Sequence, residues 1–482
     1  MKQAQIFEHR RSGVLLHITS LPSANLGQDA YRFVDFLHHV GVSIWQMLPL
    51  GPTHKEGSPY QCLSAHAANI NLISIDILKQ QSWANENELN GLTFSTMMAH
   101  AYRQFIAQAT ESEKQAFEEF QTQQQYWLED YVLFCEIRHS HHAMAWYHWP
   151  DELRDREPSA IQKVRDDRQE ALAIRCFEQF QFFQQWHALK HYANERNVKL
   201  FGDMPIFVAH DSVDVWAAPE LFSLDNSGRP ETVAGVPPDY FSETGQRWGN
   251  PLYRWQQHID QDFLWWRQRL QTQLELFDLI RIDHFRGFDA CWEIPAHCET
   301  AIEGQWTKAP GEALFDNLLD FFGELPLVAE DLGIITEEVT ALRTKYAMPG
   351  MKILQFAFGS DATNPYLPHN HCIDSVTYTG THDNDTTLGW YQTLDDNAKN
   401  HIAEYFAEPN QTMPWLLIQA ALRSVSQLAI IPMQDILSLD GEHRMNVPGT
   451  IEGNWNWQFD WEMLDDQITD NLKNLNELYG RC

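Results

Sequence analysis

Eight short apolar runs spread along the chain most constrain what these 482 residues can fold into. The runs are rich in Val, Ile, Leu and Phe, and most are near-continuous, which is typical of strands buried on both faces of a parallel sheet. Helical or irregular sequence separates them, so the sequence predicts an α/β fold, a (β/α)₈ TIM barrel. The runs cover residues 13–19, 43–50, 199–207, 279–285, 325–331, 351–358, 376–383 and 428–437.

A long gap between the second and third runs predicts an insertion in this barrel. The gap holds about 150 residues, far more than a plain connection needs. Aromatic residues from Phe117 to Phe134 recur at helical spacing and predict one helix, and the apolar residues from Cys176 to Leu189 predict another. We therefore expect a catalytic barrel over 1–50 and 198–482, with a mostly helical insertion subdomain over 51–197. The stretch 208–277, rich in Gly, Pro, Trp and Tyr, predicts a subdomain of elaborated βα loops, where barrels place specificity.

The charge balance narrows the possible partners. The chain has 34 Lys and Arg against 66 Asp and Glu, a net charge of −32. Such a chain repels phosphate, so we expect no nucleic acid and no anionic membrane surface as partner. No Gly-x-Gly-x-x-Gly or P-loop pattern occurs, and no His or Cys group has the spacing of a zinc site. We therefore expect neither a cofactor nor a metal.

The lack of a recognisable targeting signal and the pattern of cysteines both favour a cytoplasmic protein. No apolar run approaches the roughly 18 residues that span a bilayer, and the first ten residues lack the apolar stretch of a signal peptide. The seven cysteines are scattered and form no Cys-x-x-Cys pair. This usage is typical of free thiols in a reducing compartment.

Acidic residues at the ends of three predicted strands suggest glycosidic bond cleavage. Asp283, Glu330 and Asp383 follow different runs, and the carboxyl ends of barrel strands meet at one face. One carboxylate can act as nucleophile and a second as general acid/base, while a third holds sugar hydroxyls. Arg281 lies two residues before Asp283, on the same side of a strand, where it would keep Asp283 ionised. Glu330 needs the opposite environment, with a raised pKa. The alternative for any single acid is a helix N-cap or a salt-bridge partner.

Several long segments resemble one known family. They include Gly202-Asp-Met-Pro-Ile-Phe207, Arg281-Ile-Asp-His-Phe-Arg-Gly-Phe288 and Gly380-Thr-His-Asp-Asn384, with further matches at 45–53, 58–61, 235–251, 329–333 and 444–446. Together they resemble the 4-α-glucanotransferases (amylomaltases or disproportionating enzymes) of glycoside hydrolase family 77, related to the α-amylase clan. The resemblance covers nearly the whole chain.

The resemblance implies a role for each matching residue. Asp283 would be the nucleophile, Glu330 the general acid/base, and Asp383 the stabiliser of the distorted donor sugar. Trp248 would belong to a loop that folds over the acceptor side. The remaining residues of the substrate-binding site would be Tyr60, Asp203, Arg281 and His382.

The family also implies the reaction. The enzyme would move a segment of an α-1,4-glucan (maltodextrin donor) to the 4-hydroxyl of glucose or a maltodextrin acceptor, by a retaining double displacement. Two alternatives stay open: a hydrolase of the same clan, and a catalytically silent maltodextrin-binding protein. Lys55 replaces an aromatic residue linked to a remote glucan-binding groove in the family, which argues against that groove and against large cyclic products. The sequence does not indicate an oligomeric state.

Overall fold

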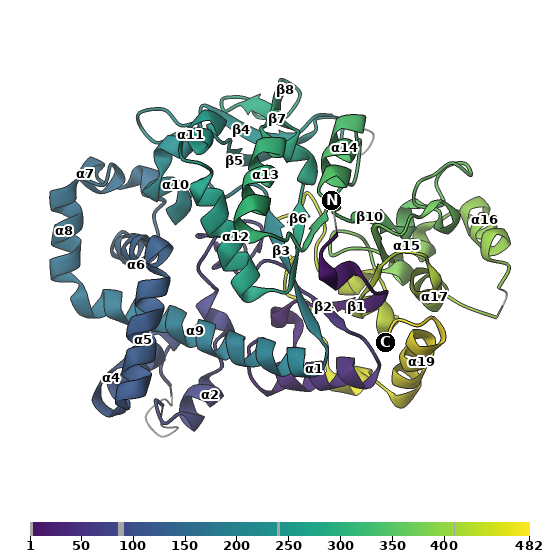
Figure 1. Cartoon of the computed structure of the whole chain (residues 1–482), viewed down its shortest axis with the longest axis horizontal. Helices are drawn as coiled ribbons and strands as arrows, with labels where there is room; N and C mark the ends of the chain where they lie inside the picture. The colour runs from purple at the N-terminus through teal and green to yellow at the C-terminus, as the bar shows by residue number, and fades with distance from the viewer. Residues whose placement is uncertain (1–2, 85–90, 239–241, 409) are drawn as a thin grey trace.

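Eight parallel strands close into a barrel in the computed structural model, which describes residues 3–84, 91–238, 242–408 and 410–482 (Figure 1). Their order around the barrel is β1-β12-β11-β10-β9-β6-β3-β2. The predicted (β/α)₈ TIM barrel is confirmed, and each apolar run overlaps one strand. The strands are β1 Arg11–Leu15, β2 Ile44–Gln46, β3 Lys199–Pro205, β6 Leu279–Asp283, β9 Leu327–Ala329, β10 Gly350–Ile353, β11 Ser375–Tyr378 and β12 Leu428–Pro432.

The strands are largely apolar because most residues on both of their faces are buried. One core cluster contains residues from all eight strands and fills the barrel, with Leu279 as the contribution of β6. Ile280 and Ile282 of the same strand belong to the larger cluster that includes the surrounding helices. Successive side chains of a strand point to opposite faces, so six of the strands contribute to both clusters, whereas β10 and β11 contribute only to the cluster inside the barrel.

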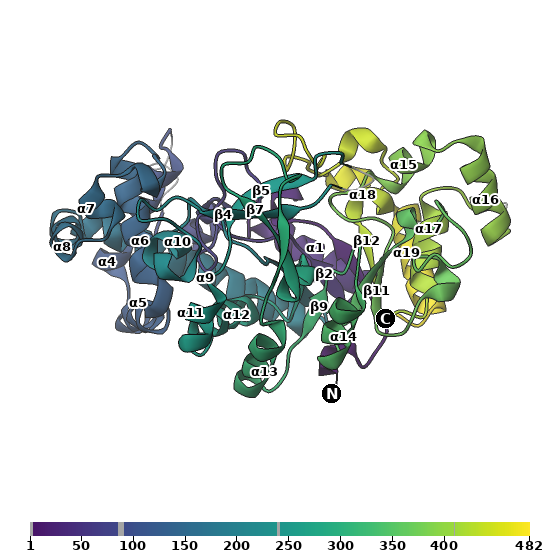
Figure 2. The ribbon, with the colours of Figure 1, turned by 90° about the horizontal axis from the view of Figure 1, so that it is seen from above.

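Helices surround the barrel and extend the molecule at both ends (Figure 2). Those that follow the barrel strands in the second half of the chain cover its outside or project at the end opposite the insertion. The helices are α1 Gln28–His39, α2 Ile75–Gln80, α4 Phe94–Gln108, α5 Glu111–Gln123, α6 Gln125–Ser140, α7 Asp151–Arg154, α8 Pro158–Asp167, α9 Gln169–Glu195, α10 Val213–Ala217, α11 Trp255–Asp260, α12 Leu264–Leu276, α13 Gly311–Phe322, α14 Glu337–Lys345, α15 Thr387–Thr393, α16 Asp396–Phe406, α17 Trp415–Arg423, α18 Met433–Ile436 and α19 Asp466–Leu478.

The helices α2 to α8, between β2 and β3, lie at one end of the molecule, drawn in blue in Figures 1 and 2, and α9 runs from there to the barrel. The long helix α9 packs against α1, α4, α5 and α6 and returns the chain to β3. The single helix expected from Phe117 to Phe134 is wrong, because α5 ends at Gln123, α6 begins at Gln125, and Gln124 lies between them. The buried Gln124 side chain accepts a hydrogen bond from Trp127 Nε1 (2.7 Å), which anchors the turn between the two helices.

A second sheet covers part of the barrel mouth, where loops alone were expected. Its four antiparallel strands have the order β5-β4-β7-β8. Only two of them fall within 208–277, because β4 pairs with β7 about 60 residues further along the chain. Such pairing depends on the partner strand and not on local propensity. The strands are β4 Thr232–Val236, β5 Gln246–Pro251, β7 Ala290–Pro295 and β8 Gln305–Lys308.

The end of the chain is fastened to the seam where the barrel closes. Arg481 is fully buried, and β1 pairs with β12 beside it. Its guanidinium donates hydrogen bonds of 2.5–3.5 Å to the carbonyl oxygens of six residues from three parts of the chain: Arg11, Ala421, Leu422, Ser424, Ser426 and Gln427. One side chain therefore links β1 and the segment that leads into β12 to α17.

All seven cysteines are free thiols. Among the residues that the structure describes, no helix has the length and apolar character needed to cross a membrane.

Candidate active site

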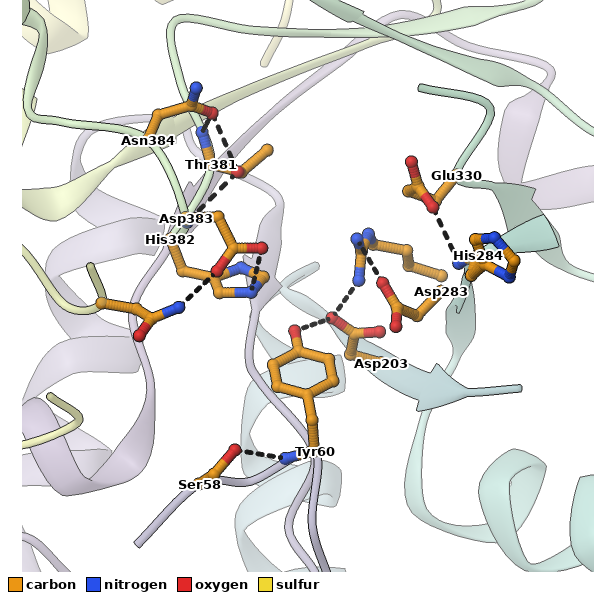
Figure 3. Close-up of polar contacts among 12 residues, drawn as sticks. Ser58, Tyr60, Asp203, Asp283, His284, Glu330, Thr381, His382, Asp383 and Asn384 are labelled. Carbon is orange, nitrogen blue, oxygen red and sulfur yellow. Dashed lines mark hydrogen bonds and ion pairs between the residues drawn. The ribbon is translucent and has the colours of Figure 1, made fainter. Parts of the chain in front are cut away.

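Three carboxylates gather at the carboxyl ends of the barrel strands. Asp283 is the last residue of β6, Glu330 directly follows β9, and Asp383 lies five residues beyond β11. Figure 3 shows Asp383 on one side of the site and Asp283 with Glu330 on the other. The barrel brings the three acids to one mouth because its strands are parallel and end at the same face.

Arg281 of β6 binds the carboxylate of Asp283. Its Nη2 donates to Asp283 Oδ1 (2.8 Å) and its Nη1 donates to Asp203 Oδ2 (2.6 Å). Burial alone would lower the pKa of Arg281. The negative charges of Asp203 and Asp283 raise it by more, so the pKa of Arg281 lies well above its usual value. A permanent positive charge therefore lies beside the Asp283 carboxylate, as the spacing of two residues in the strand predicts.

Asp203 of β3 lies beneath the site and not in its wall. Its side chain is fully buried, and its Oδ2 accepts hydrogen bonds from Tyr60 Oη (2.7 Å) and from Arg281. In this structure the Asp203 carboxylate orients Tyr60 and Arg281 (Figure 3). A direct contact between Asp203 and the sugar, which the resemblance implies, stays a prediction.

Glu330 has the environment that a general acid needs. Its Oε2 accepts from the backbone N–H of His284 (2.7 Å), and its Oε1 accepts from that of Leu332 (2.9 Å). Burial raises the pKa of Glu330 to about 7, a direction that Arg281 opposes and Asp283 supports. Burial thus shifts the pKa of Glu330 in the direction expected from the sequence, and a carboxyl group with this pKa carries a proton for part of the time at neutral pH.

Asp383 is held at the opposite side of the mouth. Asn446 Nδ2 donates to its Oδ1 (2.6 Å), and His382 Nε2 lies 3.3 Å from its Oδ2. The Asp383 side chain is 48% exposed, so it can reach a bound sugar. The His382 ring stacks on Tyr60 with 5.2 Å between ring centroids and 13° between planes, and Trp455 lies 6.0 Å from both rings.

Trp248 lies in strand β5, and the loop expected around it is wrong. Gly245 (φ +66°) precedes the strand and Gly249 (φ +82°) lies within it, where the register with β4 shifts. Positive φ at these glycines shapes a turn before the strand and an irregular ladder within it. The indole meets the His284 ring edge to face, with 4.8 Å between centroids. Trp248 therefore lies beside the residue whose backbone holds Glu330. Residues 239–241 of the same motif lie outside the described residues.

Comparison with known proteins identifies the family. The family model for 4-alpha-glucanotransferase matches residues 16–464. The chain belongs to this family. It is 48% identical to the 4-alpha-glucanotransferase of Thermus thermophilus over 93% of this chain and 94% of that one. It is 44% identical to the 4-alpha-glucanotransferase of Synechocystis over 99% of both chains.

A solved structure of an amylomaltase has the same fold. The amylomaltase from Streptococcus agalactiae, in complex with acarbose, superposes with a TM-score of 0.94 at 36% identity, over 98% of this chain and 99% of that one. The fold is therefore that of the 4-alpha-glucanotransferase family in nearly every element.

The site of this family member contains two side chains that sequence reasoning missed. Asn446 holds Asp383, and Trp455 flanks the Tyr60–His382 stack. Asn446 belongs to a matching motif, but no spacing rule links it to an aspartate 63 residues earlier. Trp455 belongs to the segment Asn454-Trp-Asn-Trp457, a cluster typical of sugar contact. Among the described residues, no group of three or more His, Cys, Asp or Glu side chains could hold a metal ion.

Proposed function

We propose that the chain is a 4-α-glucanotransferase that cleaves α-1,4-glucans and transfers the released segment to the 4-hydroxyl of glucose or a maltodextrin. The pairing of an arginine-bound Asp283 with a Glu330 of pKa about 7 carries the proposal. These are the two carboxylates of a retaining mechanism. Membership of the family, at up to 48% identity to named transferases, supports this reaction over hydrolysis or simple binding.

In the first step Asp283 attacks the anomeric carbon of the donor sugar. The C1–O bond breaks, a covalent bond to the Asp283 carboxylate forms, and Glu330 gives its proton to the departing 4-oxygen. In the second step Glu330 removes the proton from the 4-hydroxyl of the acceptor, which displaces Asp283. Two inversions give net retention. Asp383 stabilises the distorted donor sugar through its hydroxyls.

The donor chain has a place to bind beyond Asp383. A hollow of about 400 Å³ opens next to Trp455, between the loops after β1 and β2 and the segment that carries Met445. Its lining includes the aromatic face of Trp455 and the amides of Asn69, Asn71 and Gln458. Indole faces and amide groups suit the C–H faces and hydroxyls of glucose units. Free thiols favour a reducing compartment such as the cytoplasm, where a maltodextrin pool would supply both substrates.

The products of maltotriose test the proposal. A ladder of longer maltodextrins together with glucose means transfer, and maltose with glucose alone means hydrolysis. Binding of maltotriose without any product would leave the maltodextrin-binding alternative. We expect the ladder.

The pH dependence of the first step should report Glu330. We expect kcat/KM for maltotriose to fall about tenfold per pH unit above pH 7, because only the protonated carboxyl group donates to the leaving oxygen. Glu330→Gln cannot titrate, so the residual activity of this variant should lack that alkaline limb. The measurement is initial-rate kinetics between pH 5 and 9. A wild-type profile that stays flat up to pH 9 would contradict the acid role of Glu330.

Trp248→Ala should raise the ratio of hydrolysis to transfer and leave bond cleavage largely intact. The indole covers the His284 side of the mouth, where an acceptor ring can stack and exclude water from the intermediate. A bound acceptor competes with bulk water through orientation, which is worth effective molarities of about 10⁵ M or more. The measurement is free reducing ends against redistributed chains at several acceptor concentrations. Trp415→Ala, at the start of α17 away from the site, is the control; an equal change in both variants would refute the role of Trp248.

A further inference from the structure

Glu330 depends on two loops for its orientation. Its backbone N–H donates to Ile282 O (3.0 Å), and its carbonyl accepts from Phe285 N (3.1 Å), so the main chain is tied to β6 and the turn after it. Its carboxyl group accepts from His284 N in that turn and from Leu332 N in its own loop. His284 has left-handed backbone angles (φ 51°, ψ 52°). The Glu330 carboxyl group therefore keeps its orientation only while the loop after β9 stays packed against the turn after β6.

Arg286 connects these two loops. It belongs to the short 3₁₀ turn Phe285–Phe288, directly after Asp283 and His284. Its Nη1 donates to the carbonyl oxygen of Ile334, two residues beyond Leu332. Gly333 between them has φ +85°, so the loop turns sharply at this point. A guanidinium that holds Ile334 limits the movement of Leu332 N–H away from the Glu330 carboxyl group.

An indole in turn holds the Arg286 side chain. The guanidinium carbon lies 3.9 Å from the ring centroid of Trp306 in β8, a cation–π geometry. Trp306 meets Trp292 of β7 edge to face at 5.3 Å, which fixes the indole on the second sheet. Arg286 thus connects three parts of the protein: the second sheet, the turn that follows Asp283 and the loop that carries Glu330.

We propose that Arg286 is a positioning residue that keeps the Glu330 carboxyl group aimed at the leaving oxygen. The inference rests on the proposed function, because it assigns Arg286 to the acid step of that reaction. Arg286 acts on the geometry of Glu330. The ionisation of Glu330 is set by burial first and then by Arg281 and Asp283. Loss of Arg286 should therefore weaken proton donation and spare the attack by Asp283.

Two donors of the same maltosyl group separate these steps. With maltotriose, cleavage of the C1–O bond needs the proton of Glu330. With α-maltosyl fluoride, the C1–F bond breaks as the bond to Asp283 forms, and fluoride leaves without that proton. Arg286→Met should lower kcat/KM about 10- to 100-fold for maltotriose, as expected for a misplaced acid, and less than about threefold for the fluoride. Arg286→Lys, which retains a donor, should recover part of the loss.

Three controls make the result decisive. Arg32→Met removes another guanidinium–indole contact, that of Arg32 with Trp461 at 4.1 Å, which involves neither the Glu330 loop nor the turn after β6, and should change neither rate. Glu330→Gln should show the same preference for the fluoride, more strongly; if it does not, the role of Glu330 in the proposed function fails. If Glu330→Gln behaves as expected but Arg286→Met and Arg286→Lys lose equally on both donors, or lose nothing, the positioning role of Arg286 is refuted. Thermal unfolding of each variant shows whether it is folded. If Arg286→Met does not fold, the comparison of the two donors is made with Arg286→Lys.

Discussion

Replacement of Asp283 by Asn is expected to lower maltotriose turnover by about 10⁴- to 10⁶-fold while the fold is retained. The amide keeps the shape of the side chain, and its oxygen can still accept from Arg281 Nη2, but it does not attack an anomeric carbon. The measurement is the rate of glucose release together with a far-UV circular dichroism spectrum and a melting curve. Covalent capture provides a second readout, because Glu330→Gln given α-maltosyl fluoride should accumulate a maltosyl group on the peptide that contains Asp283.

Asp289→Asn is the matched control for Asp283→Asn. This carboxylate lies six residues further along the same segment and pairs with the exposed Lys308 at 2.8 Å. Because Lys308 is largely exposed and Asn keeps the shape of the Asp289 side chain, we expect the loss of this ion pair to cost about 1 kcal/mol and the activity to stay close to wild type. Substantial transfer by a folded Asp283→Asn variant, or an equal loss in both variants, would remove Asp283 from the nucleophile role.

Arg481→Met is expected to destabilise the protein by about 3–5 kcal/mol. The methionine fills part of the space, but it removes the hydrogen bonds that Arg481 donates to buried carbonyl oxygens at the barrel seam, and lost buried hydrogen bonds are costly. Ser424 O keeps a second donor in Arg10 Nη2 (2.7 Å), and Gln427 O keeps one in Arg11 N (2.8 Å). The denaturant midpoint and melting temperature should both fall, while the activity of the remaining folded protein is unchanged.

Arg103→Met is the control for this effect. Arg103 pairs with Glu170 on the surface at 2.8 Å, and both side chains are largely exposed. Its removal should change the free energy of unfolding by less than about 1 kcal/mol. If Arg481→Met is as stable as Arg103→Met, the hydrogen bonds at the seam do not hold the end of the chain in solution.

The sequence predicts those features that depend on a local period. The barrel is predicted by the apolar runs, which are typical of strands buried on both faces. The Arg281–Asp283 contact is predicted by the alternation of side chains in a strand. The acid environment of Glu330 could also be anticipated, because the chemistry demands a raised pKa for one of two neighbouring carboxyl groups. These inferences need no knowledge of distant contacts.

The features that were missed or wrong depend on contacts between distant segments. Trp248 lies in a strand because β4 supplies a partner for Gln246–Pro251, a segment with glycine and proline that does not predict a strand by itself. Asn446 reaches Asp383 only through the fold. The burial of Asp203 likewise depends on Tyr60, which arrives from the loop after β2. The periodicity of apolar residues in the sequence does not predict such contacts between distant segments.

The closure of the barrel between β1 and β12 has a consequence for synthesis on the ribosome. Residue 15 is made early, and its partner strand begins at residue 428. At 5–20 residues per second, one edge of β1 waits about 20–80 s for its partner. During that time β1 has β2 on one side and an unpaired row of backbone donors and acceptors on the other, which is the kind of edge that recruits strands from other chains. We expect the nascent chain to need protection by chaperones over this interval, and the growing chain to resist proteolysis at β1 only after β12 has emerged.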